Sequence, residues 1–448
     1  MFSSDFLNGL YIVPILAVLI LIHEFGHFFA ARLCGVKVEE FGIGIPPRLF
    51  GFVWKGVLWS VNLIPFGGFV RVKGEDGKNL EPDSMNAQPA GERAFFLSAG
   101  AGMNVLLAIV LMIAVIGFQG IPHNHIYIGG VAPGSPAAKA GWQAGDRLVK
   151  INGKEMESTE EIVSVTAAHE GEPIKVTIER RGKFVETTVV PRKNPPKGEG
   201  RVGVTLVTRT VGTLTVEQVT PGSAAAMAGL LPGDRLISIN NRPVTDEFVV
   251  STELDRYQGA TVPLVVERAG TEIQIAMPVP RQVPGQDLML QTGLASLRFR
   301  PEFERVPAAQ VIPRGFEEAY KQTRQMLLGL KELFSSRENL DQVAGPVGMG
   351  QLTSELIEES VLPLWVTLAS LTIVLSLNLA LLNLLPIPAL DGGRLLFVLI
   401  EVLRGGRRIA PEKEGIVHLA GLVLLIGLMF VIGFSDIRRL ISGETFLR

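Results

Sequence analysis

Charged residues are scarce in this sequence. Asp, Glu, Lys and Arg make up 19% of its 448 residues, whereas a typical soluble domain carries about 25%. The formal net charge is only -2, so no basic excess supports binding to nucleic acid, and no nucleic-acid partner is expected. A single cysteine, Cys34, excludes an internal disulfide framework. Hydrophobic residues reach 47%, and this balance indicates a membrane protein.

Four apolar runs are long enough to span about 30 Å of hydrocarbon as helices. They lie near residues 8–31, 95–119, 361–385 and 415–434. The first run has no basic segment before it and no small-residue cleavage site after it, so we expect it to be retained. The predicted fold class is a multi-pass α-helical membrane protein with about four transmembrane helices.

The segment between the second and third runs contains an internal repeat. The sequence GDRL begins at Gly145 and again 88 residues later at Gly233, and TIERRG at Thr177 recurs as VVERAG 88 residues later at Val265. One offset shared by two separate motifs indicates two copies of one domain. In each copy a helix of small residues leads through a Gly-Asp turn into an alternating strand.

Both copies resemble PDZ domains, which bind extended peptides by strand addition to a sheet edge. A role as a spacer or steric screen is equally open. We therefore expect two α/β PDZ-like domains inserted between the second and third transmembrane helices. The expected regions are 1–122 (first two transmembrane helices), 123–205 and 206–296 (PDZ-like domains), 297–360 (amphipathic helical connector) and 361–448 (last two transmembrane helices).

The connector contains a predicted amphipathic helix over residues 315–334. Its apolar side chains share one face, which packs as in an ordinary amphipathic helix or lies on the membrane. These side chains are Phe316, Tyr320, Leu327, Leu330 and Phe334.

The first apolar run contains the sequence His23-Glu24-Phe25-Gly26-His27. An ionisable residue at the middle of a membrane helix costs about 2.5–3.5 kcal/mol on insertion scales, so this cluster needs an explanation. Residues four apart lie about 40° apart around a helix, so both histidines can bind one Zn²⁺ at about 2.0–2.1 Å. Glu24 lies one residue on, where it can take a proton from the attacking water. The alternative is a polar cluster packed against polar groups of another helix.

A catalytic zinc requires a third protein ligand and an open position. Asp391 follows the third run, after Pro386 and Pro388, which break the helix. The first and third runs cross the membrane in the same direction, and Asp391 and both histidines lie toward the C-terminal ends of their runs. The three side chains therefore fall on one side of the bilayer. We predict one Zn²⁺ per chain, bound by His23, His27 and Asp391.

The charges that flank the runs predict the side of the membrane. The loop from Arg32 to Arg93 carries eight Lys and Arg residues, and the connection 394–413 carries five more. By the positive-inside rule both are cytoplasmic. The predicted metal site then lies near the cytoplasmic face, and the PDZ-like pair is extracytoplasmic. Three arginines in the C-terminal tail argue weakly for the opposite side.

Together these features resemble the site-2 protease family of intramembrane zinc metalloproteases over nearly the whole chain. They are HEFGH in the first run, LDGG after the third, and the PDZ-like pair between the second and third. NLLPIPALDGG is similar to the family's N-x-x-P-x-P-x-L-D-G-G element, and IPFGGFVRV to its membrane-associated hairpin. The second run departs from the relatives' Gly-Pro-x-x-Asn pattern, because Ala101 replaces the proline.

The resemblance implies regulated intramembrane proteolysis in a bacterial cytoplasmic (inner) membrane. The partners would be the lipid bilayer and single-span substrates, anti-sigma-factor-like or signal-peptide-like, already trimmed by another protease. His23, His27 and Asp391 would be the zinc ligands, and Glu24 the general base. The alternative function is a membrane-tethered PDZ adaptor with a non-catalytic metal cluster.

Five further residues are candidates for substrate binding. A peptide bond inside an intact helix is shielded by its neighbours, so a substrate must unwind before it is cut. A strand edge that contains Gly67, Gly68 and Phe69 could hold the unwound segment by strand addition, or the glycines form an ordinary hairpin turn. Asn378 and Asn383, in the third run, could hold the substrate backbone or make an interhelical hydrogen bond.

Overall fold

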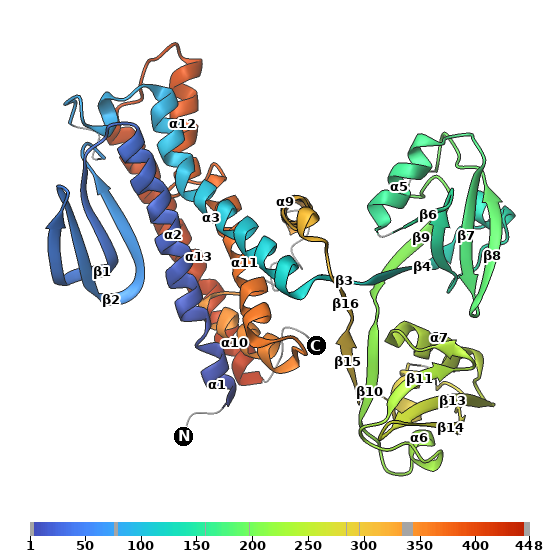
Figure 1. Cartoon of the computed structure of the whole chain (residues 1–448). Coiled ribbons are helices and arrows are strands. Elements are labelled where there is room, and N and C mark those ends of the chain that lie inside the picture. The colour runs from blue at the N-terminus through green and yellow to red at the C-terminus, as the bar shows by residue number, and fades with distance from the viewer. Residues whose placement is uncertain are drawn as a thin grey trace. The chain divides into compact units, whose positions relative to one another are not determined.

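The computed structural model describes residues 4–75, 79–156, 158–196, 198–283, 285–294, 296–333 and 344–442 (Figure 1). The chain divides into two compact units, each described by itself. Gly120–Glu304 form the inserted unit, and Met1–Gln119 together with Arg305–Arg448 form the helical unit.

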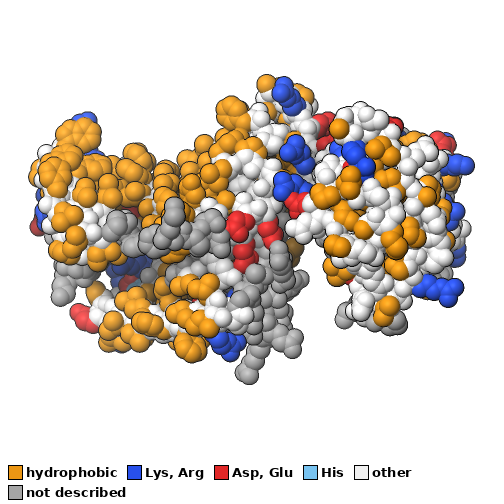
Figure 2. Space-filling model, turned by 90° about the horizontal axis from the view of Figure 1, so that it is seen from below, with side chains coloured by type: hydrophobic (Ala, Val, Ile, Leu, Met, Phe, Trp, Pro, Cys, Tyr) orange, Lys and Arg blue, Asp and Glu red, His pale blue; other side chains and the backbone are white. Residues whose placement is uncertain are grey.

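Four helices in the described part of the helical unit are long and apolar enough to cross a membrane. These candidate spans are Phe6–Leu33, Ala90–Gln119, Leu364–Leu384 and Pro411–Ser442. Each overlaps one predicted apolar run, and hydrophobic side chains cover much of this unit in Figure 2. The helices of the unit are α1 (Ser4–Gly9), α2 (Ile12–Leu33), the 3₁₀ turn Met85–Ala87, α3 (Ala90–Gln119), α9 (Ala308–Leu333), α10 (Pro346–Glu359), α11 (Leu364–Leu384), α12 (Asp391–Leu403) and α13 (Pro411–Ser442).

Glycines bring α2 and α3 into close contact. A Cβ atom at Gly26 of α2 would lie 2.3 Å from the carbonyl oxygen of Ala99. A Cβ atom at Gly100 of α3 would lie 2.5 Å from Nε2 of His27. Neither position has room for a side chain, and small residues are the usual means of close approach between membrane helices. The contact places the histidines of α2 directly against the backbone of α3.

Two long strands between α2 and α3 form a separate sheet, β1 (Val38–Trp54) and β2 (Val57–Val72). Trp54 pairs with Val57 at the turn between them. Phe41 lies opposite both Trp59 and Val70, so the beginning of β1 lies between two stretches of β2. Among the described residues, the end of β2 therefore has a strand partner on one side only and forms an edge of this sheet.

The predicted apolar face of α9 is largely exposed in the helical unit. Phe316, Tyr320 and Leu327 are exposed, and Phe334 lies outside the described residues. The contact with α3 is made by Gly315 instead, where a Cβ atom would lie 2.4 Å from Cγ1 of Ile113. A small residue thus lets the helices approach on another side, and the exposed apolar face fits the second predicted alternative, in which it lies on the membrane.

The inserted unit contains two sheets of the same topology. The strand orders are β8-β7-β5-β4-β9 and β14-β13-β11-β10-β15, with β6 paired to β5 and β12 to β11. The first domain contains β4 (Asn124–Val131), α4 (Pro136–Lys139), β5 (Arg147–Ile151), β6 (Lys154–Glu155), α5 (Thr159–Ala168), β7 (Ile174–Arg180), β8 (Lys183–Val189) and β9 (Val204–Thr210). The second contains β10 (Gly212–Gln218), α6 (Ala224–Met227), β11 (Arg235–Ile239), β12 (Arg242–Pro243), α7 (Glu247–Arg256), β13 (Thr261–Arg268), β14 (Thr271–Pro278), α8 (Leu288–Thr292) and β15 (Ser296–Pro301).

The chain enters and leaves this unit through one pair of short strands. β3 (Ile121–Pro122) is antiparallel to β16 (Phe303–Glu304), with Pro122 opposite Phe303. The predicted domain boundary at residue 205 falls inside β9, and the one at 296 is the first residue of β15. Both boundaries cut an edge strand because β9 and β15 come last in their domains, after the repeated motifs from which the boundaries were predicted.

The repeated Gly-Asp turn places a buried carboxylate at the same point in both domains. Asp146 accepts two hydrogen bonds from Arg180, at 2.8 and 2.6 Å. Asp234 accepts two from Arg268, both at 2.7 Å. Burial disfavours the charged form of Asp234, but the bonds from Arg268 and from the Leu231 N–H outweigh it and hold the pKa of Asp234 below its usual value.

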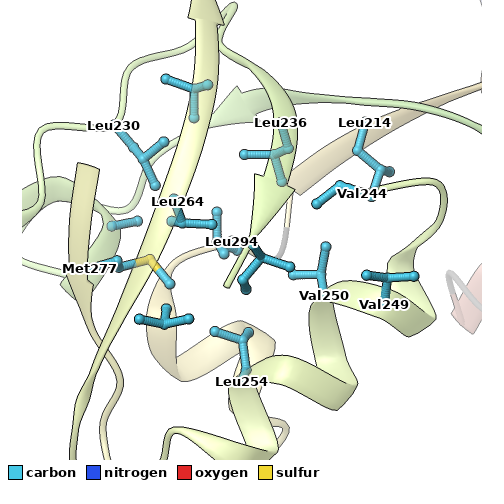
Figure 3. Packing of buried hydrophobic residues seen from close by; sticks show 14 of the residues in the cluster. Leu214, Leu230, Leu236, Val244, Val249, Val250, Leu254, Leu264, Met277 and Leu294 are labelled. Carbon is cyan, nitrogen blue, oxygen red and sulfur yellow. The ribbon is translucent and has the colours of Figure 1, made fainter. Parts of the chain in front are cut away.

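Each domain has a hydrophobic core, and the two domains share a contact. In the second core, Leu236 and Leu264 from the sheet face Val250 and Leu254 of α7 (Figure 3). Tyr127 of the first domain belongs to this second core, and its hydroxyl donates to Asp246 at 3.2 Å. Burial and the neighbouring Asp246 raise the pKa of Tyr127 to about 12. The pair is therefore joined by buried side chains as well as by the chain itself.

Candidate metal centre

Two imidazoles meet on one face of α2. His23 and His27 are 8% and 6% exposed, and their Nε2 atoms lie 3.1 Å apart. The predicted helix and the four-residue spacing bring them together, and Gly100 of α3 leaves room for both rings. Nδ1 of His27 lies 2.9 Å from the carbonyl oxygen of Phe96, a contact that fixes the proton on Nδ1 and leaves Nε2 as the free nitrogen.

Asp391 comes to the same point from the first residue of α12. Its Oδ2 atom lies 3.1 Å from Nε2 of His23 and 3.3 Å from Nε2 of His27. The two glycines after it have no room for side chains: a Cβ atom at Gly392 would lie 2.1 Å from the carbonyl oxygen of Leu385, and one at Gly393 would lie 2.4 Å from that of Ile387. The LDGG sequence thus folds α12 tightly back onto the end of α11.

This group fits a tetrahedral metal ion. The three ligand atoms lie within 4.8 Å of one another, and this is the one such group in the described residues. Ligands about 2.0–2.1 Å from a tetrahedral zinc lie about 3.3 Å apart, close to the observed spacing. Two buried Nε2 atoms 3.1 Å apart need a proton or a cation between them, because their lone pairs otherwise repel. Two imidazoles and a carboxylate are a donor set that Zn²⁺ prefers.

Glu24 lies beside the group but outside it. Its Oε2 atom accepts a hydrogen bond of 2.9 Å from the backbone N–H of Val70. Its Oε1 atom makes no hydrogen bond to a described residue. The edge of β2 thus holds one oxygen of this carboxylate and leaves the other available.

The structure brings the predicted residues of β2 to the site. Gly68 lies against α2, where a Cβ atom would lie 3.1 Å from Leu21 and 3.8 Å from Cγ of Glu24, and 2.9 Å from the carbonyl oxygen of Gly42 in β1. Gly67 has a positive φ of 80°, which favours glycine. Phe69 pairs with Gly42 across the sheet. Of these three residues Gly68 adjoins Glu24 directly, and Gly67 and Phe69 are its neighbours along β2.

Asn378 and Asn383 form no described hydrogen bond with the other predicted site residues. Both lie on α11 and are partly exposed. Neither side chain makes a hydrogen bond to a described residue, so the interhelical bond expected as one alternative is not seen in the described part of the chain.

A buried polar residue that was not among the predicted site residues lies on α3. Asn104 is fully buried, and neither atom of its side-chain amide has a partner among the described residues. It follows Gly100 by four residues and so shares the helix face that meets the histidines. Nδ1 of His23 is likewise buried without a partner. Two clues were available: a lone asparagine within an apolar run, and its match to the asparagine of the relatives' Gly-Pro-x-x-Asn pattern.

The chain is similar in sequence to known proteins. The zinc metalloprotease RasP of Geobacillus kaustophilus is 26% identical over 95% of this chain and 97% of its own length. The regulator of sigma-E protease RseP of Escherichia coli is 28% identical over 95% of this chain and 97% of its own length. Among solved structures, the PDZ domain of the SdrC-like protein Lmo2051 from Listeria monocytogenes is 25% identical, with a TM-score of 0.17, over 18% of this chain and 86% of that domain.

The sequence model of Peptidase family M50 matches residues 11–428. This range includes both histidines, Glu24, Asp391 and the two PDZ-like domains. The predicted family and the predicted zinc metalloprotease activity are therefore confirmed. The chain belongs to Peptidase family M50, the site-2 protease family of zinc metalloproteases.

Proposed function

We propose that this protein is an intramembrane zinc endopeptidase that cleaves single-span membrane proteins within or near the bilayer. The observation that supports it most directly is the convergence of His23, His27 and Asp391 within 4.8 Å, with the histidines on a helix long and apolar enough to cross a membrane. A peptide segment that lies in the membrane can reach such a group directly. Family membership favours this function over the adaptor alternative.

In this proposal one Zn²⁺ is bound by Nε2 of His23, Nε2 of His27 and a carboxylate oxygen of Asp391. Three protein ligands leave a fourth position open, as catalytic zinc sites require. When bound, the ion polarises water and the scissile carbonyl. The carbonyl oxygen of Phe96 orients His27 through Nδ1, and such partners of ligating histidines set ring orientation and ligand basicity.

Glu24 is the proposed general base. It accepts a proton from the attacking water and returns it to the leaving nitrogen. The Val70 N–H holds Oε2 at 2.9 Å, so the carboxylate is oriented while Oε1 remains available to the water. Positioning by the backbone costs no side-chain reorganisation during the reaction.

We expect Glu24→Gln to lower cleavage by about 10²–10⁴-fold, the usual cost of losing a positioned general base. Zinc content should not change, because the amide can still accept from Val70 and all three ligands remain. The measurement is cleavage of a tagged single-span protein on co-expression, with metal analysis of the purified variant. Glu401→Gln serves as the control: that buried carboxylate is bonded to Arg93 and Arg408, and its loss should leave cleavage largely intact. Wild-type turnover in Glu24→Gln would refute the assignment.

The unwound substrate is proposed to bind along the edge of β2. Gly68, between Gly67 and Phe69, adjoins Glu24, and the end of β2 has an unpaired side among the described residues. Strand addition there would align a peptide backbone with the site through main-chain hydrogen bonds. The partly exposed amides of Asn378 and Asn383 on α11 are proposed to hold the substrate backbone as well.

A photoreactive benzoylphenylalanine at position 69 should cross-link to a substrate trapped on the Glu24→Gln variant. The matched control is the same group at Phe52, which pairs with Trp59 at the other side of this sheet. Mass analysis of the cross-linked products gives the yield at each position. Equal yields at both positions, or none at Phe69, would contradict strand addition at the end of β2.

We further propose the bacterial cytoplasmic (inner) membrane as the location, with the metal site near the cytoplasmic face and the inserted unit outside. The Lys and Arg residues of the loop 32–93 and the connection 394–413 support this orientation. Substrates are then single-span proteins that another protease has trimmed, and the PDZ-like pair screens them by size. The alternative is recruitment, because β9 and β15 end their sheets and each leaves an edge to which a peptide can add.

Excision of the inserted unit distinguishes screening from recruitment. Because Pro122 lies opposite Phe303 in an antiparallel pair, residues 123–302 can be replaced by Asn-Gly, a two-residue hairpin turn. We expect this variant to cleave substrates that still carry a folded outer domain, and Glu24→Gln in the same background to abolish that cleavage. Refusal of the intact substrate, together with poor cleavage of the trimmed one, would indicate recruitment instead.

A further inference from the structure

The turn between α11 and α12, which leads to Asp391, is held in place by a helix that is not one of the two it connects. The chain leaves α11 at Leu384, turns through Pro386 and Pro388, and enters α12 at Asp391. Ala389, two residues before the carboxylate, has a φ of 78°. This is the left-handed region, which a residue with a Cβ atom adopts only when its surroundings hold it there.

One contact that holds it comes from α13. The backbone N–H of Ala389 donates a hydrogen bond of 2.9 Å to Nδ1 of His418. Nδ1 is therefore the unprotonated nitrogen of this ring, and the proton is on Nε2. The ring packs against Phe397 of α12, with 5.5 Å between ring centroids. His418 thus touches the segment on both sides of Asp391.

A second contact lies three residues further along the same helix. A Cβ atom at Gly421 would lie 2.4 Å from Cβ of Pro388 and 2.7 Å from its carbonyl oxygen. The backbone of α13 therefore rests directly on Pro388. Gly415, Gly427 and Gly433 of the same helix have open space where a Cβ would be. The close approach is confined to the glycine next to His418 on this helix face.

We infer that α13 positions the third zinc ligand, with His418 and Gly421 as positioning residues. His418 fixes the peptide of Ala389, Gly421 fixes Pro388, and together they set the direction in which Asp391 leaves the turn. Without them Ala389 relaxes from its left-handed conformation, and the carboxylate moves away from the two Nε2 atoms. This inference rests on the proposed assignment of Asp391 as a ligand.

The test uses pairs of variants in the full-length protein. Asn at position 418 keeps an acceptor the same number of bonds from the backbone as Nδ1, whereas Leu has the same branching and no acceptor. We expect His418→Leu to weaken zinc binding, measured by chelator competition, by about 10–100-fold, the usual effect of removing a partner that orients a ligand. His418→Asn should remain close to wild type. Cleavage should follow the same order.

Glycine variants provide an independent comparison, which remains informative if His418→Leu does not fold. Gly421→Ala should weaken zinc binding in the same way, whereas Gly427→Ala, with open space at Cβ, should not. Equal zinc affinity in His418→Leu and wild type, equal loss in the Asn and Leu variants, or equal behaviour of the two glycine variants would overturn the inference. Asp391→Ala distinguishes a failure of the ligand assignment from a failure of the inference about α13. If this variant retains zinc, the ligand assignment fails and the inference with it. If only Asp391→Ala loses zinc, the inference alone fails.

Discussion

The constraint on which the helical unit depends is that ionisable groups in an apolar helix must be satisfied by partners brought to them. His23, Glu24 and His27 would each cost free energy in hydrocarbon if left alone. The histidines instead face each other and Asp391 at 3.1–3.3 Å, and Glu24 is held by a backbone N–H. The packing around the site follows from this need, because α3, β2 and α12 each place one polar partner against α2. These partners are the Phe96 carbonyl, the Val70 N–H and the Asp391 carboxylate.

These partners can reach α2 because glycines let the backbones of neighbouring helices approach closely. Gly26 and Gly100 allow α2 and α3 to touch, and Gly392 and Gly393 fold α12 onto the end of α11. In a bilayer the hydrophobic effect does not drive helices together, so packing and hydrogen bonds between them carry the association. A methyl group at any of these positions would meet backbone or imidazole atoms. The glycines are thus part of the geometry of the candidate metal centre, although none is a proposed ligand.

The sequence predicted the elements whose pattern is local. The apolar runs, the shared face of His23 and His27, and the 88-residue repeat each follow from periodicity or spacing within one segment. Asp391 could be added because its place after the third run gives its side of the membrane. In contrast, the unpartnered amide of Asn104, the bond from Val70 to Glu24 and the support of Ala389 by His418 depend on contacts between distant segments. No periodicity in a single sequence encodes those contacts.

Zinc K-edge X-ray absorption of the purified full-length protein shows directly whether two histidines and one aspartate hold a single zinc ion, because it reports the ligand atoms of the bound ion. We expect one zinc per chain with nitrogen and oxygen neighbours at about 2.0–2.1 Å, and the outer-shell scattering of two imidazoles. A sulfur neighbour, which only Cys34 or a methionine could supply, or a shell without imidazole scattering, would contradict this ligand set.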